Sequence, residues 1–304
     1  MRPLPPISAP GGVARAAVMR ASGIPHHRLY ASDQVRPIYG TVTSSGVDPH
    51  AFDTRVAAAK LLLREGRFLS RRTAARLYGL PVPGGNEAID VGVIWPMTPP
   101  RRTGIAAHRI QVGCLLELPA APNWLPTPAE VWALLSAILP IDQLVTVGDA
   151  IVSGLTRRST ALSTLDQLHE TRRRFAGCAG SRKMQEALPL LRTGVESPSE
   201  SLIRLKIIRA GFPEPVTACP VETAARLYTS DLGYPEWKIA IEYEGEYHFT
   251  GGIEQARRDA SRHEAMADAG WIVLRATARD LRDPREFLGR LANAIHRRRR
   301  TPKI

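Results

Sequence analysis

The chain has 304 residues, of which 44% are hydrophobic and 23% charged, a composition that excludes general disorder and suits two or three compact units. The longest apolar stretch, Val131 to Val147, contains Pro140 and Asp142 and is shorter than the roughly 20 residues that cross a bilayer, so no membrane segment is predicted. The beginning of the chain is too rich in proline for a secretion signal, and a cytoplasmic protein is expected.

The net charge is +12, and most of the basic residues are arginine. Such a balance favours a polyanionic partner, and DNA is the expected one. Arginine-rich composition also occurs generally in proteins of GC-rich genomes. Charge alone therefore raises the expectation of DNA binding only modestly.

Three cysteines, Cys114, Cys178 and Cys219, are far apart in the sequence. None belongs to a C-x-x-C pair, so the pattern supports neither a disulfide framework nor a zinc site. Buried or unreactive thiols in a reducing compartment are expected.

Residues 1–95 are expected to contain a winged helix-turn-helix. A helix is predicted over residues 13–21, a turn at Gly23, a second helix over residues 25–30, and an extended segment after it. In this interpretation the second helix presents Arg28 to DNA. A small helical bundle without a DNA-binding role fits the same short pattern.

Residues 96–194 are predicted to be mostly helical. The preceding region supplies helices over residues 52–63 and 70–78 and a buried strand over residues 88–95, and residues 105–118 are expected to be extended. The helices of the middle region are predicted at residues 129–139, 144–153 and 162–175.

Residues 195–304 are predicted to form an α/β sandwich. The expected order is a helix (198–210), two strands (226–232 and 238–243), a helix (253–269), a strand (271–276) and a final helix (284–299). Strands enclosed by helices at both ends are typical of a compact α/β domain. The whole chain is therefore predicted to be of α/β class.

Acidic residues gather on the predicted hairpin of this last region. Asp231 lies on its first strand, and alternation along the second places Glu242 and Glu244 on the face opposite Ile241. Carboxylates so close together repel one another, and a divalent cation with oxygen ligands would offset that repulsion. Asp231 and Glu242 are therefore predicted to bind Mg²⁺ or Mn²⁺, which would polarise a phosphodiester and lower the pKa of a bound water.

The spacing of Asp231 from Glu242-x-Glu244 resembles the core of the PD-(D/E)XK nuclease superfamily. More closely, residues 195–299 resemble the domain of unknown function numbered 559, which is related to very-short-patch-repair endonucleases. The matching pieces follow the family's order and are Glu196 to Ser201, Asp231, Ile241 to Gly245, His248, Asp259 with Arg262, and Gly270 to Arg275. A restriction-endonuclease-like fold is therefore expected.

The resemblance implies that Asp231 and Glu242 bind the metal. It also implies that Glu200 points toward the same site from the first helix, and that His248 transfers a proton or contacts a phosphate. Glu244 stands where the superfamily usually has a lysine, and a carboxylate cannot supply that positive charge. Either Glu244 is an added metal ligand, or a nearby arginine takes the role of the lysine, or the site is inactive.

Simpler explanations exist for each of these residues. Glu200 fits a helix capping box with Ser197. Asp231 fits a turn, and the two glutamates of the second strand fit an exposed strand face. Arg262 fits a surface ion pair with Asp259 on the same helix, or it lines a phosphate-binding groove together with Arg257 and Arg258.

Residues 70–81 and the stretch Gly148-Asp149-Ala150 resemble the N-terminal region of AbiEi-type antitoxin proteins of abortive-infection systems. This resemblance implies a DNA-binding winged helix and a role in regulation or phage defence. Two functions are therefore expected as alternatives. The first is a metal-dependent DNA endonuclease or nickase in repair or phage defence. The second is a non-catalytic, antitoxin-like transcriptional regulator that carries a silent nuclease fold and pairs with a toxin-like protein.

Overall fold

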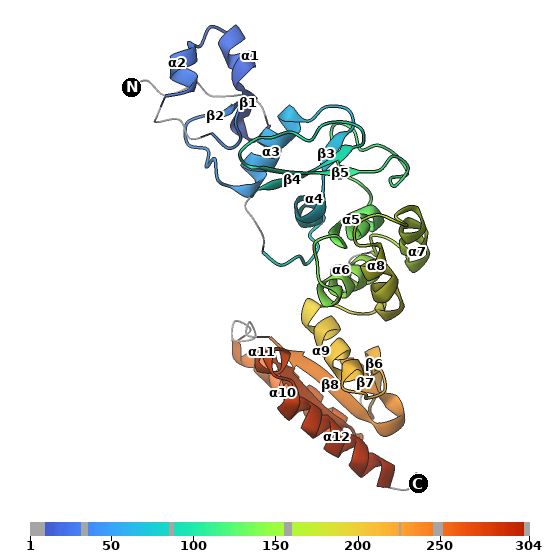
Figure 1. Ribbon diagram of the computed structural model, residues 1–304. Helices are drawn as coiled ribbons and strands as arrows, with labels where there is room; N and C mark the ends of the chain where they lie inside the picture. Colours follow the sequence, from blue (N-terminus) through green and yellow to red (C-terminus); the bar gives the residue numbers. More distant parts are fainter. Residues whose placement is uncertain are drawn as a thin grey trace. The chain divides into compact units, whose positions relative to one another are not determined.

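The chain folds into two compact units. The computed structural model describes residues 10–31, 36–84, 88–154, 160–224, 226–245 and 252–300, with the backbone alone for residues 10 and 252–259. The first unit consists of residues 1–139 and 166–185, and the second of residues 140–165 and 186–304 (Figure 1). Of the helices in these described ranges, none has both the length and the apolar composition of a membrane span.

These boundaries differ from the three regions predicted at residues 1–95, 96–194 and 195–304. The middle region is divided because its parts are tied to different units. Arg174, in the returning segment, pairs with the buried Glu130 of the first unit at 3.4 Å. The helix that precedes this returning segment in the sequence belongs to the second unit, where it takes part in the buried ion pair described below.

The first unit contains two small sheets with helices around them. Strands β1 and β2 pair antiparallel, and the second sheet has the order β3-β4-β5, with β4 and β5 parallel. The region before residue 195 is thus less purely helical than expected. The elements are η1 (Pro10–Gly12), β1 (Val13–Arg15), α1 (Ala16–Ala21), α2 (His26–Leu29), β2 (Thr41–Thr43), α3 (Phe52–Leu62), β3 (Arg67–Leu69), α4 (Arg71–Leu77), β4 (Ile89–Ile94), β5 (Ile105–Ile110), α5 (Pro128–Leu135), α7 (Leu165–Arg174) and α8 (Ser181–Ala187).

The start of the first unit has the predicted order of helix, glycine turn, helix and strand. Gly23 follows α1 with a φ of 88°, a left-handed conformation that glycine adopts without steric cost. Helix α2 is a single turn, and β2 pairs back onto β1. Arg28 on α2 is half-buried, so its guanidinium is less accessible than a DNA-reading side chain on an exposed helix would be.

The second unit is a three-layered α/β sandwich, with helices packed on both faces of its sheet. Its four-stranded sheet has the order β6-β7-β8-β9, antiparallel except for the parallel pair β8 and β9. Helices α9 and α12 pack on one face around Ile203 and Leu291, and α10 packs on the other through Met266. The elements are α6 (Ile141–Ser153), η2 (Leu188–Leu190), α9 (Pro198–Arg209), β6 (Val216–Glu222), β7 (Leu227–Tyr234), η3 (Pro235–Trp237), β8 (Ile239–Glu244), α10 (Gly252–Asp268), β9 (Ile272–Thr277), α11 (Ala278–Arg282) and α12 (Arg285–Arg300).

The predicted α/β class is confirmed, since each unit combines helices with at least one sheet. The predicted hairpin and crossover helix of the last region are present as β7, β8 and α10. Strand β6 is an addition to the predicted elements. It lies at the edge of the sheet, a position that tolerates its Pro220 because an edge strand leaves one row of N–H groups unpaired.

A buried ion pair joins α6 to α9. Asp149 and Arg204 both have 0% side-chain exposure, and Arg204 Nη2 lies 2.8 Å from Asp149 Oδ2. The same oxygen accepts a hydrogen bond from Ser201 Oγ at 2.7 Å, and Oδ1 accepts the backbone N–H of Arg192 at 2.7 Å. Arg204 Nη1 pairs with Glu214 at 2.8 Å. This network fixes the first half of α9 against α6.

Removing one partner of the buried pair is expected to destabilise the second unit strongly. In Arg204→Ala, Asp149 is left buried without its counter-charge, which costs about 3–5 kcal/mol. The same two helices also carry an exposed pair, Asp142 with Arg209, whose loss in Arg209→Ala should cost only ~0–1 kcal/mol. Urea unfolding of the two variants measures the difference, and equal small losses would refute the special role of the buried pair.

Candidate functional site

The sheet of the second unit forks where the predicted acids lie. Backbone pairing between β7 and β8 ends at the pair Leu232–Ile241. Beyond it β7 continues beside β6, and β8 continues beside β9. Asp231 and Glu242 are therefore the first residues past the shared ladder, one on each branch. We call this point the fork.

Side chains replace backbone hydrogen bonds at the fork. Asp231 Oδ2 accepts the backbone N–H of Tyr243 at 2.8 Å, and Ser230 Oγ donates to the carbonyl of Ile241 at 2.8 Å. Backbone groups in a protein interior need such partners. Asp231 thus has a structural role at the fork, and it is held by β8 rather than lying free at the end of a turn.

Glu242 faces helix α10 and is 9% exposed. Its Oε1 lies 2.5 Å from Arg262 Nη2, and its Oε2 lies 2.7 Å from His263 Nε2. Despite the short contact, Oε1 is buried and receives no hydrogen bond of normal geometry from the residues that the structure describes. Side chains of α10 therefore offset the repulsion among the acids. This is the repulsion that the sequence predicts a metal ion to offset.

Arg275 brings a further positive charge to Glu244. Its Nη1 lies 3.0 Å from Glu244 Oε1, and its Nη2 lies 2.8 Å from His263 Nδ1. Arg275 reaches this position because it is directly opposite Glu242 in the parallel pairing of β8 with β9. An arginine is therefore present beside the position where the nuclease superfamily usually has a lysine.

Glu200 caps its own helix and also lies in the electrostatic field of Asp231. Ser197 Oγ accepts the backbone N–H of Glu200 at 3.3 Å, and Glu200 Oε2 accepts the backbone N–H of Glu196 at 2.9 Å. Burial, together with the Asp231 carboxylate, raises the pKa of Glu200 to about 7. Capping and proximity to the predicted site are both features of this residue.

A cavity of about 400 Å³ lies within the second unit, and its lining includes Glu196, Ala218 and Thr229. Thr229 is two residues before Asp231 on β7, and its carbonyl accepts a hydrogen bond from Arg262 Nη2 at 2.6 Å. The cavity therefore adjoins the β7 branch of the fork and offers space for part of a ligand.

Several predicted site residues lie outside this geometry. His248 lies outside the described residues, and the side chains of Arg257 and Arg258 are likewise not described. In the described part of the chain, no three His, Cys, Asp or Glu side chains are grouped closely enough to hold a metal ion. Asp231, Glu200 and Glu242 are thus near the fork without forming such a group.

Sequence reasoning missed His263 and Arg275. The signal for His263 was available, because Met266 is a buried apolar residue of α10 that faces the sheet. Residues three and four positions before it, His263 and Arg262, share its side of the helix. The role of Arg275 depends on the strand register, which one sequence does not provide.

A second cluster of charge lies in the first unit. Four arginines, Arg15, Arg64, Arg67 and Arg102, line a cavity of about 420 Å³. Arg102 Nη1 donates to the carbonyl of Tyr39 at 2.8 Å, and Arg67 Nη2 donates to that of Thr98 at 3.3 Å. None of the four forms an ion pair with a described acidic residue, so this arginine cavity is suited to an anion.

Comparisons with known proteins find mycobacterial relatives of the chain. No family model matches the chain. The uncharacterized proteins MT2308 and Rv2248 of Mycobacterium tuberculosis are each 26% identical over 257 residues, which cover 81% of this chain and 87% of theirs. The crystal structure of the RV2827C protein from Mycobacterium tuberculosis is 16% identical and covers 66% of this chain and 72% of its own, with a TM-score of 0.38.

The raised pKa of Glu200 predicts a pH dependence of stability. The folded-state pKa, about 7, lies above the ordinary value of 4.5. The stability contributed by the protonated group is therefore fully present below about pH 4.5 and lost as pH rises through 7. Glu200→Gln stays neutral, so its stability relative to the wild type should increase by about 2 kcal/mol between pH 5 and pH 8.

Urea unfolding at several pH values measures this difference. Glu222→Gln is the matched control, because Glu222 is exposed at the end of β6. A difference between Glu200→Gln and the wild type that stays constant from pH 5 to pH 8 would contradict the prediction.

Proposed function

We propose that the second unit is a metal-dependent DNA endonuclease or nickase that hydrolyses phosphodiester bonds. The fork is the observation that carries the proposal, because it brings Asp231 and Glu242 to the end of one short ladder on two diverging branches. The order of α9, three antiparallel strands, α10 and a parallel fourth strand agrees with the nuclease superfamily that the sequence resembles. Asp231 and Glu242 are the proposed metal ligands.

The donor chemistry at the fork fits a hard divalent cation. Asp231 and Glu242 offer carboxylate oxygens, and Glu242 Oε1 is buried without a hydrogen bond of normal geometry from a described residue. Mg²⁺ is commonly held by one or two carboxylates together with waters and substrate phosphate, so a group of three acidic side chains is not required. Bound there, Mg²⁺ or Mn²⁺ would polarise the phosphodiester and lower the pKa of a coordinated water.

Arginines beside the fork would bind the substrate phosphate. The guanidinium groups of Arg262 and Arg275 can each donate two parallel hydrogen bonds to phosphate oxygens. Both arginines contact carboxylates in the structure. An arriving phosphate would therefore replace Glu242 and Glu244 as the acceptor of the arginine hydrogen bonds. This exchange would free carboxylate oxygens at the fork. Arg257, Arg258 and His248 remain predicted contacts of the same substrate.

A plasmid-nicking assay tests the proposal. We expect the purified chain to convert supercoiled DNA to the open-circular form with Mg²⁺ or Mn²⁺. Asp231→Asn and Glu242→Gln should each lower the rate by more than about 100-fold, since loss of even an indirect partner of a metal site costs 10–100-fold. Glu222→Gln, which makes the same chemical change on an exposed strand end, should retain full activity.

Metal binding provides a readout that does not depend on finding the right DNA. Isothermal titration with Mn²⁺ should show a site in the wild type and in Glu222→Gln that is lost in Asp231→Asn. Failure of the chain to cleave any DNA or RNA tested, together with the absence of Mn²⁺ binding, would overturn the proposal.

A second candidate function is a non-catalytic, antitoxin-like regulator that binds DNA through its first unit. Two observations favour it. Each Glu242 oxygen already has a basic side chain beside it, Arg262 at Oε1 and His263 at Oε2, and the arginine cavity lies beside α1 and β2 of the predicted winged helix. Phosphate contacts of this kind give affinity without reading sequence. In this case the second unit would serve for grip or for contact with a toxin-like partner.

The salt dependence of DNA binding tests this second function. Arg64→Ala and Arg102→Ala should each lower the slope of log K against log salt concentration by about 0.9, the contribution of one phosphate contact. Arg173→Ala is the control, because this exposed arginine of α7 pairs with Glu170 away from the cavity. Unchanged slopes in both cavity variants would exclude the arginine cavity as a DNA contact. Asp231→Asn is expected to bind DNA as the wild type does.

A further inference from the structure

Two of the three cysteines meet in the folded first unit. Cys114 and Cys178 are 64 positions apart in the sequence, yet their Sγ atoms lie 3.1 Å apart. The distance between these two cysteines in the sequence is therefore not kept in the fold. Both are free thiols, and an Sγ–Sγ bond is about 2.0 Å long. A movement of about 1 Å would bring the two sulfur atoms to bonding distance.

Glycine turns place the two thiols against each other. Gly113 precedes Cys114 with a φ of 88°, and Gly177 precedes Cys178 with a φ of 80°. Both values lie in the left-handed region that glycine occupies at low cost. Gly180, also in the left-handed region, sits so close to Ser136 that a Cβ there would lie 2.1 Å from its Oγ. The turn that carries Cys178 therefore packs tightly on the end of α5.

An ion pair anchors the other side of the contact. Arg174 Nε donates to the carbonyl of Cys114 at 3.2 Å, while its Nη2 pairs with Glu130 at 3.4 Å. The Glu130 side chain is 1% exposed, and its Oε1 also accepts the backbone N–H of Leu116 at 2.7 Å. The loop of Cys114 and the end of α7 are thus both bound to the same buried carboxylate. This shared contact holds the two thiols next to each other.

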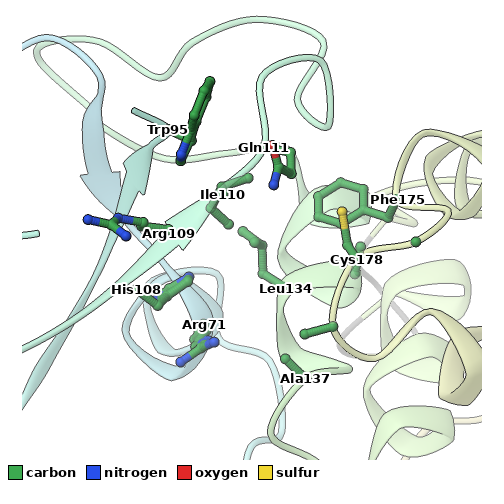
Figure 2. Close-up of a pocket in the computed structure, with 13 residues that line it drawn as sticks. Arg71, Trp95, His108, Arg109, Ile110, Gln111, Leu134, Ala137, Phe175 and Cys178 are labelled. Atoms are coloured by element: carbon green, nitrogen blue, oxygen red, sulfur yellow. The ribbon is translucent and has the colours of Figure 1, made fainter. Parts of the chain in front are cut away.

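The two thiols differ in their access to solvent. Cys178 is partly exposed and lines a pocket of about 400 Å³, where it lies near Phe175 and Leu134 (Figure 2). The same pocket is bordered by the positively charged Arg71 and Arg109. Cys114 is 3% exposed, and burial with the contact to Cys178 raises its pKa to about 12. A small oxidant can therefore reach Cys178, whereas Cys114 is a buried thiol.

We propose that Cys114 and Cys178 are a peroxide-sensitive pair that forms a reversible disulfide within the first unit. In the first step the Cys178 sulfur attacks a peroxide oxygen. An S–O bond forms, the O–O bond breaks, and the leaving hydroxide takes the proton of the Cys178 thiol and departs as water. In the second step the Cys114 sulfur attacks the Cys178 sulfenic acid. The S–S bond forms, the S–O bond breaks, and the hydroxide leaves with the Cys114 proton as a second water. Two thiols and one hydrogen peroxide give one disulfide and two waters.

The disulfide would tie the loop after β5 to the turn between α7 and α8. These segments belong to the first unit but are separated along the chain by α5, α6 and α7, of which α6 belongs to the second unit. Closing so long a loop restricts the unfolded chain far more than the folded one. The oxidised first unit should therefore resist unfolding better than the reduced one.

Thiol counting and peptide mapping test the proposal on the full chain. The reduced protein is treated with hydrogen peroxide, alkylated, digested and analysed by mass spectrometry. We expect the number of free thiols to fall from three to one, with Cys114 and Cys178 in one linked peptide and Cys219 alkylated. Dithiothreitol should restore all three thiols. The thermal midpoint of the oxidised protein should be several degrees higher and return on reduction.

Three variants distinguish this pair from ordinary cysteine oxidation. Cys219→Ser, which changes the buried cysteine of the second unit, should still form the disulfide and show the thermal shift. Cys178→Ser should lose both. Cys114→Ser should accumulate a dimedone-reactive sulfenic acid at Cys178. The proposal fails if wild-type protein keeps three free thiols under peroxide, or if its disulfides join different chains. It fails equally if Cys219 is oxidised as fast as Cys178. These wild-type readouts hold even if a variant does not fold.

Discussion

The position of α9 is the constraint on which the candidate site depends, and the buried pair Asp149–Arg204 sets that position. Arg204 lies one helical turn after Glu200, so fixing its guanidinium against α6 also fixes the capped first turn of α9. Glu200 is thereby held close enough to Asp231 for the two carboxyl groups to interact. A buried ion pair is costly to desolvate, and its benefit to net stability is small. Its effect here is geometric, because it permits one placement of the helix and excludes others.

The fork shows how a sheet can open without exposing unsatisfied backbone. Apolar side chains on both faces, Ile241 toward α9 and α12 and Ala240 toward α10, hold the paired part of β7 and β8 between two layers. Where the strands part, Ser230 and Asp231 supply the hydrogen bonds that the ladder no longer makes. An acidic residue at this point is thus compatible with a structural function alone. The metal role proposed for Asp231 would therefore be added to this structural one.

Local patterns in the sequence predicted the elements of the second unit well. The capping signal at Ser197 and Pro198 located the start of α9, and the alternation around Ile241 located β8. Strand β6 was not predicted, because Pro220 argues against a strand unless the strand is known to lie at the edge of the sheet. Partners set by tertiary structure could not be predicted in the same way. Glu242 was assigned to a metal because its neighbours on the strand are visible in the sequence, whereas the α10 side chains that contact it, Arg262 and His263, are not.

Charge distinguishes what the two units can do with a nucleic acid. Among the described residues at the fork, the carboxylates of Asp231, Glu242 and Glu244 outnumber the guanidinium groups of Arg262 and Arg275, so a bound cation would lessen the repulsion that an approaching phosphate meets. The arginine cavity of the first unit has no described acidic partner and attracts a phosphate by itself. The proposed nuclease activity at the fork would therefore require a cation, whereas the proposed DNA binding by the first unit would not. The two proposed functions therefore differ in one requirement: hydrolysis would need Asp231 and Glu242 as metal ligands, and DNA binding by the first unit would not.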